Sequence, residues 1–326
     1  YVIDGSGQDA YPLVNPWTHL IVPDDYPTIQ DAVDAANEGD TIYVRAAIYH
    51  ESINIWKSIV LRGEDRDTTI IDGGGIGNVV SISADNVTIM DFTIRNSGVT
   101  SPGAFGGIGI LGADNVIAQY NNLVNNDDGI WLYDSNHNTF ASNNISYNVK
   151  AGMYTRYSMY NTIADNIVSN NDWGIVLRTG TFSTTVIGNS VFSNVYTGIQ
   201  VGPESALNNL VGNTIAHNDY GITVFTYGSN MLSDNNVSLS KYDGLALDGT
   251  SNNTVTRNIF SNNKITGIYL YDSYDNTFTY NKIANNGSPA VSAGIYVEYS
   301  NNNRFHHNNL IANIQTQAYS FNSVDY

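Results

Sequence analysis

Charged and aromatic residues recur at fixed distances from three successive glycines near the middle of the chain. The glycines are Gly129, Gly152 and Gly174, and an apolar residue follows each of them. Two positions before these glycines stand Asp127, Lys150 and Asp172, with Asp128 next to Asp127. Two positions after them stand Trp131, Tyr154 and Val176, and four positions after them stand Tyr133, Arg156 and Arg178. If these side chains share one surface, they could bind and process a sugar polymer.

The residue types suit an acidic polysaccharide. Aromatic faces stack on sugar rings, and Lys or Arg neutralises the carboxylate of a uronic acid. A Lys or Tyr could take the C5 proton in a lyase or epimerase, and a pair of Asp residues could act as acid and base in hydrolysis or hold Ca²⁺. The catalytic candidates are therefore Asp127, Asp128, Lys150, Arg156, Asp172 and Arg178, and the carbohydrate-binding candidates are Trp131, Tyr133, Tyr154, Arg156 and Arg178.

The same pattern has a purely structural interpretation. Asp127, Lys150 and Asp172 could pair as opposite charges across neighbouring strands, and aromatic residues fit exposed pleated surfaces. An enzyme also needs longer loops as the walls of a cleft, and the sequence offers only residues 97–106 and a slightly long turn at 287–293. This favours passive sugar contact or a structural role over catalysis. Two functions stay open: a structural surface module, and a polysaccharide lyase, C5-epimerase or glycoside hydrolase.

A second aromatic cluster occupies the equivalent positions nearer the end of the chain. It consists of Tyr269, Tyr271, Tyr296 and Glu298, and it contains no basic residue. It would therefore suit a neutral glycan or a protein partner better than a uronate.

The elements that position these residues follow from an internal repeat. The tetrapeptide Gly-Ile-x-Leu and its variants begin at Gly107, Gly129, Gly152, Gly174, Gly198, Gly221, Gly244, Gly267 and Gly294, which lie 22 to 27 residues apart. The first and third residues after each Gly are mostly apolar, so each unit opens with a half-buried strand. Two further short strands fit within each unit. The sequence therefore predicts an all-β fold, a right-handed parallel β-helix with one coil per repeat, from about residue 40 to 315.

Asparagines recur at three positions of each coil. They stand about nine, 14 and 19 residues after the glycine, as in Asn138, Asn143 and Asn148. Asn tolerates left-handed backbone angles and can cap a bend, and one Asn per coil allows the amides to bond along the axis at ~4.8 Å spacing. We interpret these asparagines as structural ladders.

A different period marks the start of the fold. Ile29, Ala32, Val33 and Ala36 have helical spacing, Thr28 and Asp31 fit a capping box, and Gly39 is a stop signal, which predicts a helix at about 28–38. This helix would cover the open end of the coil stack.

Composition restricts the partners. The chain has 326 residues, 13 Lys plus Arg against 30 Asp plus Glu, a formal net charge of −17 and no Cys. Such a charge repels nucleic acid and anionic lipid, and no apolar run is long enough to cross a membrane. The lack of Cys excludes disulfides and thiolate metal sites. We expect no cofactor, with Ca²⁺ as the one metal ion left open.

Several segments resemble known β-helix proteins. Asp25-Tyr26-Pro27-Thr28-Ile29-Gln30 and the following Glu38-Gly39-Asp40-Thr41-Ile42 are similar to the opening of proteins related to pectin methylesterases. The Gly-Ile and Asn-Thr-Ile units resemble the NosD-like, or carbohydrate-binding-and-hydrolysis, class of PbH1 repeats found in archaeal surface proteins. This resemblance implies an extracellular or cell-surface module. It also suggests copper, which is poorly supported because the chain lacks Cys and its histidines share no repeat column.

The two ends predict a domain boundary. Residues 1–19 resemble the segment that closes a preceding domain, which leaves 20–326 as the β-helix domain. Copies could then join end to end, with residues 1–17 of one packing on the C-terminal coils around Ile295, Phe305 and Leu310 of the preceding neighbour, or residues 1–17 could form a local cap. Deleting them would separate loss of association from loss of stability.

The chain also contains five N-glycosylation triplets. They begin at Asn86, Asn144, Asn236, Asn252 and Asn286. Asn286 belongs to an expected ladder, where a glycan would disturb the corner. We therefore predict glycans, if the protein is exported, at the other four, and the intact mass of native material tests this.

Overall fold

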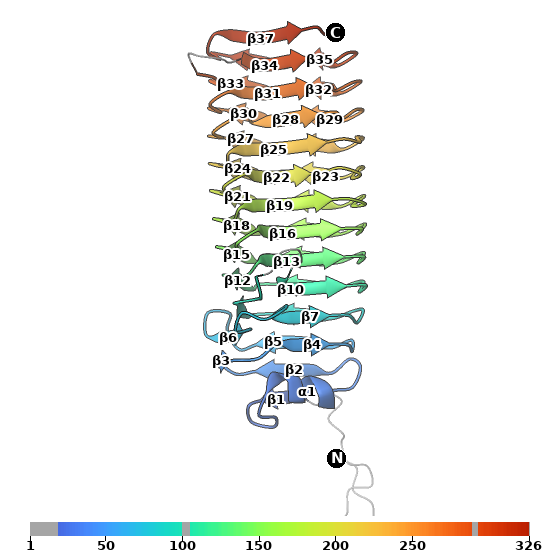
Figure 1. Ribbon diagram of the computed structural model, residues 1–326, viewed down its shortest axis with the longest axis vertical. Helices are drawn as coiled ribbons and strands as arrows, with labels where there is room; N and C mark the ends of the chain where they lie inside the picture. The colour runs from blue at the N-terminus through green and yellow to red at the C-terminus, as the bar shows by residue number, and fades with distance from the viewer. Residues whose placement is uncertain (1–18, 100–104, 289–292, 326) are drawn as a thin grey trace, which may run out of the picture.

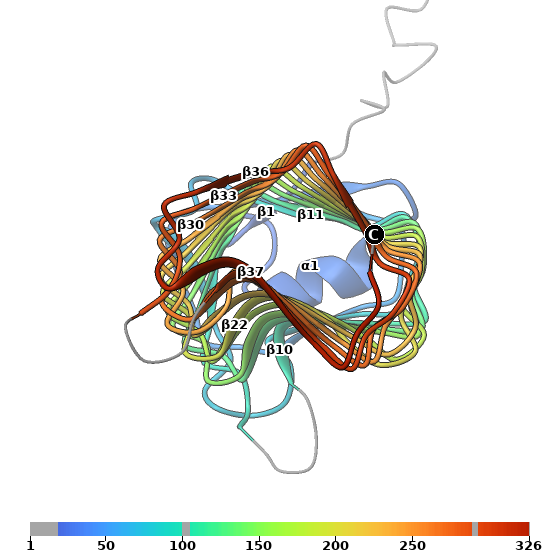
Figure 2. The same ribbon diagram turned by 90° about the horizontal axis from the view of Figure 1, so that it is seen from above.

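The computed structural model describes residues 19–99, 105–288 and 293–325. The chain winds into a straight stack of coils whose cross-section has three sides, each formed by a parallel sheet (Figures 1 and 2). The predicted β-helix is therefore confirmed. The predictions made for residues 1–18 concern residues outside these described ranges.

Sheet 1 contains the Gly-Ile-x-Leu strands. Each strand pairs in parallel with its counterparts in the coils before and after it, as β13 pairs with β10 and β16. Its members are β4 (Ile53–Ile55), β7 (Val80–Ile82), β10 (Gly106–Leu111), β13 (Asp128–Tyr133), β16 (Ala151–Arg156), β19 (Trp173–Arg178), β22 (Thr197–Val201), β25 (Tyr220–Phe225), β28 (Leu245–Asp248), β31 (Thr266–Tyr271), β34 (Ala293–Glu298) and β37 (Thr316–Phe321).

Sheets 2 and 3 follow sheet 1 within each coil. Sheet 2 is formed by β1 (His19–Val22), β2 (Thr41–Val44), β5 (Val60–Gly63), β8 (Thr88–Met90), β11 (Ile117–Gln119), β14 (Thr139–Ala141), β17 (Thr162–Ala164), β20 (Thr185–Ile187), β23 (Asn209–Val211), β26 (Met231–Ser233), β29 (Thr254–Thr256), β32 (Thr277–Thr279) and β35 (Arg304–His306). Sheet 3 is formed by β3 (Ala47–Tyr49), β6 (Thr69–Asp72), β9 (Thr93–Arg95), β12 (Asn122–Val124), β15 (Asn144–Ser146), β18 (Ile167–Ser169), β21 (Ser190–Phe192), β24 (Thr214–Ala216), β27 (Asn236–Ser238), β30 (Ile259–Ser261), β33 (Lys282–Ala284) and β36 (Asn309–Ile311).

The core lies inside the three sheets along the whole axis. The first and third residues after the glycines are buried as predicted, among them Ile130, Leu132, Ile175 and Leu177, all fully inaccessible to solvent. Because equivalent residues of successive coils are in register, like side chains stack on like side chains. The core is therefore one continuous apolar column and not a set of separate clusters.

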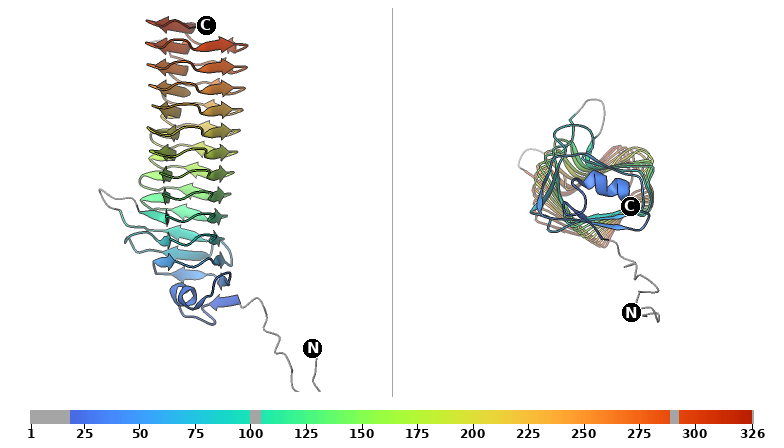
Figure 3. Two further views of the ribbon diagram at one scale, coloured as in Figure 1. Left: turned by 90° about the vertical axis from the view of Figure 1, so that its right-hand side faces the viewer. Right: turned by 90° about the horizontal axis from the view of Figure 1, so that it is seen from below.

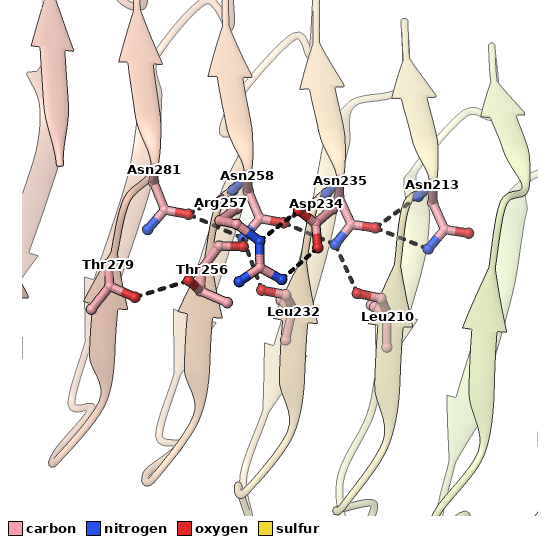
Figure 4. Close-up of polar contacts among 10 residues, drawn as sticks. All are labelled: Leu210, Asn213, Leu232, Asp234, Asn235, Thr256, Arg257, Asn258, Thr279 and Asn281. Carbon is pink, nitrogen blue, oxygen red and sulfur yellow. Dashed lines mark hydrogen bonds and ion pairs between the residues drawn. The ribbon is translucent and has the colours of Figure 1, made fainter. Parts of the chain in front are cut away.

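Buried asparagines line the three corners, which confirms the ladders. Asn235 is representative: its backbone N–H and its Nδ2 each donate to Oδ1 of Asn258 at 2.9 Å, and Nδ2 also donates to the Leu210 carbonyl at 2.8 Å (Figure 4). Equivalent bonds join the column from Asn121 to Asn308, and two further columns contain Asn138 and Asn148. Each amide therefore ties its own coil to both neighbours.

The residue with left-handed backbone angles is the one before the ladder asparagine. Asp234 and Arg257, which precede Asn235 and Asn258, have φ of 57° and 56°. The expectation that the ladder Asn itself takes this conformation is wrong. At the corner one left-handed residue turns the chain from one sheet to the next, and the following residue points its amide inward, where it is buried from water.

Helix α1 (Ile29–Ala35) covers the lower end of the stack (Figure 3). Thr28 caps it, since its Oγ1 accepts the Asp31 N–H at 3.1 Å, as predicted. The helix ends at Ala35, well before Gly39, where Ala36 takes extended angles, and Nζ of Lys57 donates to the carbonyls of Asp34 and Ala36, both at 2.7 Å. Within the described ranges no helix is long and apolar enough to cross a membrane.

Candidate functional site

A pocket of about 230 Å³ lies on the outer face of sheet 1, across β13, β16, β19 and β22. Most of its lining residues stand just before the glycines or two positions after them, while Lys150 is two before Gly152 and Arg178 is four after Gly174. The lining residues are Asp128, Lys150, Ala151, Tyr154, Trp173, Val176, Arg178 and Gln200. The structure thus brings four predicted site residues together: Asp128, Lys150, Tyr154 and Arg178.

The strand register explains this convergence. Tyr154 pairs with Val176, and Val176 with Gln200, so the second residues after the glycines form one line along the axis. Gly174 itself faces inward, since a methyl group there would collide with the Gly198 carbonyl oxygen and with Val191 in the core. Each glycine and the residue after it both face inward, so they separate two columns of outward-facing side chains, and the pocket lies between these columns.

Lys150 reaches the pocket from a buried ion pair. Its Nζ lies 2.8 Å from Oδ2 of Asp127, whose carboxylate is fully buried, and the Asp127 backbone N–H donates to Ser97 Oγ at 2.8 Å. The expectation that Asp127 lies on the exposed patch is therefore wrong, because its side chain is fully inaccessible to solvent and paired with Lys150. The alternative of cross-strand charge pairing is confirmed for this pair.

Asp128 is a buried titratable group in the wall of the pocket. Its side chain is 2 % exposed, and Oδ1 accepts the Ala151 N–H at 2.8 Å. Burial raises the pKa of Asp128 to about 7, more than the Ala151 hydrogen bond lowers it, and the nearby Asp127 adds to the rise. A carboxyl that exchanges its proton near neutral pH can serve as acid or as base.

Folding stability should therefore depend on pH through Asp128. Unfolded, this carboxyl ionises near 3.8; folded, it keeps its proton to about pH 7. Its stabilising contribution is complete below pH 4 and is lost as pH rises through 7, and Asp243, with a pKa raised to about 6 by burial, acts in the same direction. We expect Asp128→Asn to raise the free energy of unfolding at pH 8 by on the order of 2–4 kcal/mol, and by much less at pH 5.

Urea denaturation at the two pH values measures this difference. Asp134→Asn, which changes an exposed carboxyl at the corner after β13, is the control and should shift neither value. An equal effect of Asp128→Asn at pH 5 and pH 8 would show that the buried carboxyl is ionised in both.

The remaining predicted residues lie outside the pocket. Trp131 and Tyr133 stack on each other with centroids 5.8 Å apart, and Arg156 lies over the ring of Tyr157 at 4.9 Å. They form an aromatic and cationic strip beside the pocket. Asp172 is half-buried, which raises its pKa, but it is not among the lining residues.

Sequence reasoning missed Trp173. It stands one position before Gly174, in the same column as Asp128, and its ring contacts Tyr196 at 4.6 Å. The signal was available, since Asp128, Ala151 and Trp173 occupy equivalent positions of three coils. The expectation instead placed the outward column two residues before each glycine.

The glycosylation triplets have different surroundings. Asn86 and Asn252 are exposed at corners, Asn236 is exposed on β27 and Asn144 is half-buried on β15. Asn286 is fully buried within its ladder, where Nδ2 donates to Asn313 Oδ1 at 3.0 Å. Glycans at the first four stay a prediction.

The fold and the repeat define a right-handed parallel β-helix protein. Residues 173–325 match the family of right-handed β-helix regions. Residues 33–215, more than half of the chain, match the family described as periplasmic copper-binding protein (NosD), and the chain belongs to this family. No curated protein matches the sequence.

Solved structures share the fold. The A-module of a mannuronan C-5 epimerase from Azotobacter vinelandii superimposes with a TM-score of 0.62 at 16% identity, over 91% of this chain and 94% of that one. An alginate lyase from Paenibacillus sp. gives 0.58 at 14% identity, over 86% and 95%. XylC in complex with xylose gives 0.69 at 10% identity, over 90% and 83%. At these identities the likeness establishes the fold alone.

The residues present do not fit the copper that the family description names. The chain has no Cys, and the described residues contain no group of three or more His, Asp or Glu that could hold a metal ion. His306 and His307 are adjacent, but their Nδ1 atoms lie 2.9 Å apart and hydrogen-bond to each other. Asp127 and Asp128 do not fit Ca²⁺ either, because the Lys150 ammonium already pairs with the Asp127 carboxylate.

Proposed function

We propose that the chain is a rigid extracellular β-helix module of a coat, sheath, stalk or filament, and that it binds an acidic polysaccharide on the outer face of sheet 1. One observation carries the binding proposal: Lys150 and Arg178 line the same pocket as Tyr154 and Trp173. In a chain of net charge −17, Arg178 and the Lys150 of the Asp127 ion pair place basic groups beside two aromatic rings. They match a ligand that combines sugar rings with carboxylates.

The site's shape supports binding more than turnover. The pocket has a volume of only about 230 Å³. The strip of Trp131, Tyr133 and Arg156 lies on the same strands, β13 and β16. A long polymer could lie across the strands and contact several coils. Equivalent positions on neighbouring coils lie ~4.8 Å apart, so a polymer along the axis would contact Tyr154, Val176 and Gln200 in turn.

Binding of a defined oligouronate tests the proposal. Isothermal titration with a mannuronate hexamer should give measurable heat at low salt, and affinity should fall as salt increases. Arg178→Ala should weaken binding about tenfold, because it removes a charge-assisted contact. Arg304→Ala, which deletes an exposed arginine on β35 of sheet 2, should leave affinity unchanged. Equal losses in both variants, or no binding by the parent protein, would refute the proposal.

A second candidate function is catalysis on the same polymer. Asp128, with its pKa of about 7, stands in the pocket with Lys150 and Tyr154. In a lyase, one of these groups would take the C5 proton, the C4–O glycosidic bond would break and a C4=C5 double bond would form, with the leaving oxygen protonated. An epimerase would return the proton to the opposite face. A hydrolase would instead need two carboxyl groups flanking the bond.

Incubation with polymannuronate separates the two candidates. Ultraviolet absorption of the new double bond reports a lyase, proton NMR reports epimerisation, and reducing ends report hydrolysis. A rate that Asp128→Asn abolishes would establish catalysis. Binding without any of these changes would establish the passive module.

End-to-end joining of copies remains part of the proposal. Phe305 and Leu310 are only partly buried, and with Ile295 they line an apolar hollow of about 400 Å³ at the last described coil. The hollow lies where residues 1–17 of another copy are predicted to pack. Sedimentation of the full chain and of a variant lacking residues 1–17 tests this contact.

A further inference from the structure

We propose that sheet 1 carries a second ligand site, an aromatic platform on β31, β34 and β37 that binds a neutral polysaccharide. This goes beyond the proposed binding of an acidic polymer at β13 to β22. The platform is defined by Tyr269, Tyr296 and Tyr319, with Tyr271, Tyr299 and Phe321 beside them.

The rings form two contacting lines along the axis. Tyr296 lies 5.7 Å from Tyr269 and 5.1 Å from Tyr319, measured between ring centroids. Tyr299 lies 5.9 Å from Tyr271 and 5.7 Å from Phe321, edge to face in both cases. Strand register places one ring of the first line on each coil. A linear chain along the axis would therefore meet an aromatic ring at every coil.

The platform is open to a ligand. Tyr271, Tyr319 and Phe321 are 40%, 46% and 41% exposed, although aromatic residues of this size are usually more deeply buried. Tyr269 and Tyr296 are half-buried, which fixes their rings at lower cost in entropy on binding.

Fixed carboxylates flank the rings. Glu298 accepts the Tyr269 hydroxyl at 3.0 Å. Asp243 is 7% exposed, and its Oδ1 accepts the backbone N–H of Thr266 at 3.1 Å and the Thr266 hydroxyl at 2.6 Å. Burial and the hydrogen bond to Glu298 raise the pKa of Tyr269, and the negative charge of Asp243 adds to the rise. Glu298 is half-buried and held in place by Tyr269, so it can accept hydrogen bonds from sugar hydroxyls, whereas the buried Asp243 acts on the platform through its charge.

Charge selects a neutral ligand. The four strands β28, β31, β34 and β37 contain Asp248 and Glu298 but no Lys or Arg. Burial raises the pKa of Asp248, and repulsion from Asp272, at the next corner, adds to the rise, so the charges on these strands are negative. A polyuronate would be repelled here, in contrast to the pocket with Lys150 and Arg178. The two sites on one face therefore have opposite charge preference.

Affinity electrophoresis and titration calorimetry with cellohexaose and mannohexaose test the platform, with the mannuronate hexamer as the anionic probe. Whichever neutral hexamer binds the parent protein, Tyr296→Ala should weaken its affinity by about tenfold or more, because aromatic contacts dominate such sites. Tyr147→Ala, at an exposed tyrosine on the corner after β15, is the matched control and should have no effect. Circular dichroism establishes that each variant is folded.

The outcomes for the two sites are distinguishable. We expect Arg178→Ala to leave neutral binding unchanged and Tyr296→Ala to leave mannuronate binding unchanged. The platform proposal is overturned if the parent protein binds neither neutral hexamer, if Tyr147→Ala causes the same loss, or if mannuronate competes at the platform. A protein partner that binds through Tyr296 in the absence of neutral-glycan binding would also overturn it.

Discussion

Ile175→Asp is expected to prevent the β-helix from folding as one unit. Ile175 is fully buried in β19, where it stacks between Met153 and Ile199 of the neighbouring coils. Burial of such a side chain contributes ~1.5–3 kcal/mol, and an uncompensated buried carboxylate costs several more. We expect a loss of on the order of 5 kcal/mol or more, which is comparable to the whole stability of a typical domain.

The position of Ile175 in a stack makes the effect worse. Each coil contacts only its two neighbours, so a disrupted central coil separates the stack into two shorter parts with exposed ends. Thermal unfolding followed by circular dichroism, together with the soluble yield, measures the outcome. Ile167→Asp is the control, because Ile167 faces outward from β18 of the preceding coil and is 47% exposed. Equal unfolding temperatures for Ile175→Asp and the parent protein would contradict the assigned core positions.

Asn189→Leu is expected to have the second largest effect. Asn189 is fully buried, and its Oδ1 accepts both the backbone N–H and the Nδ2 of Asn166 at 2.9 Å. Its own Nδ2 donates to the Ile163 carbonyl at 2.9 Å and to Asn213 Oδ1 at 3.0 Å. Leucine has nearly the same shape but makes none of these bonds, so donors and acceptors in three coils lose partners where water cannot replace them.

Each orphaned buried group costs about 1–3 kcal/mol, so we expect a loss of roughly 3 kcal/mol or more. Chemical denaturation measures it, and hydrogen exchange should show faster exchange of the Asn166 amide in particular. Asn236→Leu is the matched control, since Asn236 is exposed on β27 and lies outside the ladders. If both substitutions destabilise equally, the ladder has no special energetic role.

The ladders already contain two natural interruptions. Thr184 and Ser240 occupy ladder positions, and both of their hydroxyls are buried without a hydrogen-bond partner within the described part of the chain. A single coil with a smaller polar side chain is therefore tolerated. Thr184→Asn and Ser240→Asn should each fill a gap in an amide column and raise the free energy of unfolding, the opposite of the effect expected for Asn189→Leu.

The sequence alone determined the features that depend on one coil and its repetition. Alternation at Ile130 and Leu132 assigns the inner face of the strand, because side chains in a strand alternate between its two sides. Recurrence of Asn143 and Asn166 at one coil length assigns the ladder, because equivalent residues of identical coils must stack. The β-helix, its core and its asparagine columns therefore follow from local pattern and period.

The tertiary structure decided what depends on neighbours outside that pattern. Asp127 is buried where its N–H donates to Ser97, 30 residues earlier in the chain, and α1 ends at Ala35, where Lys57 donates to the Asp34 carbonyl. Trp173 enters the pocket because two consecutive residues turn inward at Gly174, so the outward column shifts by one position. The repeat period and the alternation determine which residues stack and which face inward. The burial of an individual side chain and the local backbone geometry at a glycine depend on packing between residues that are distant in the sequence.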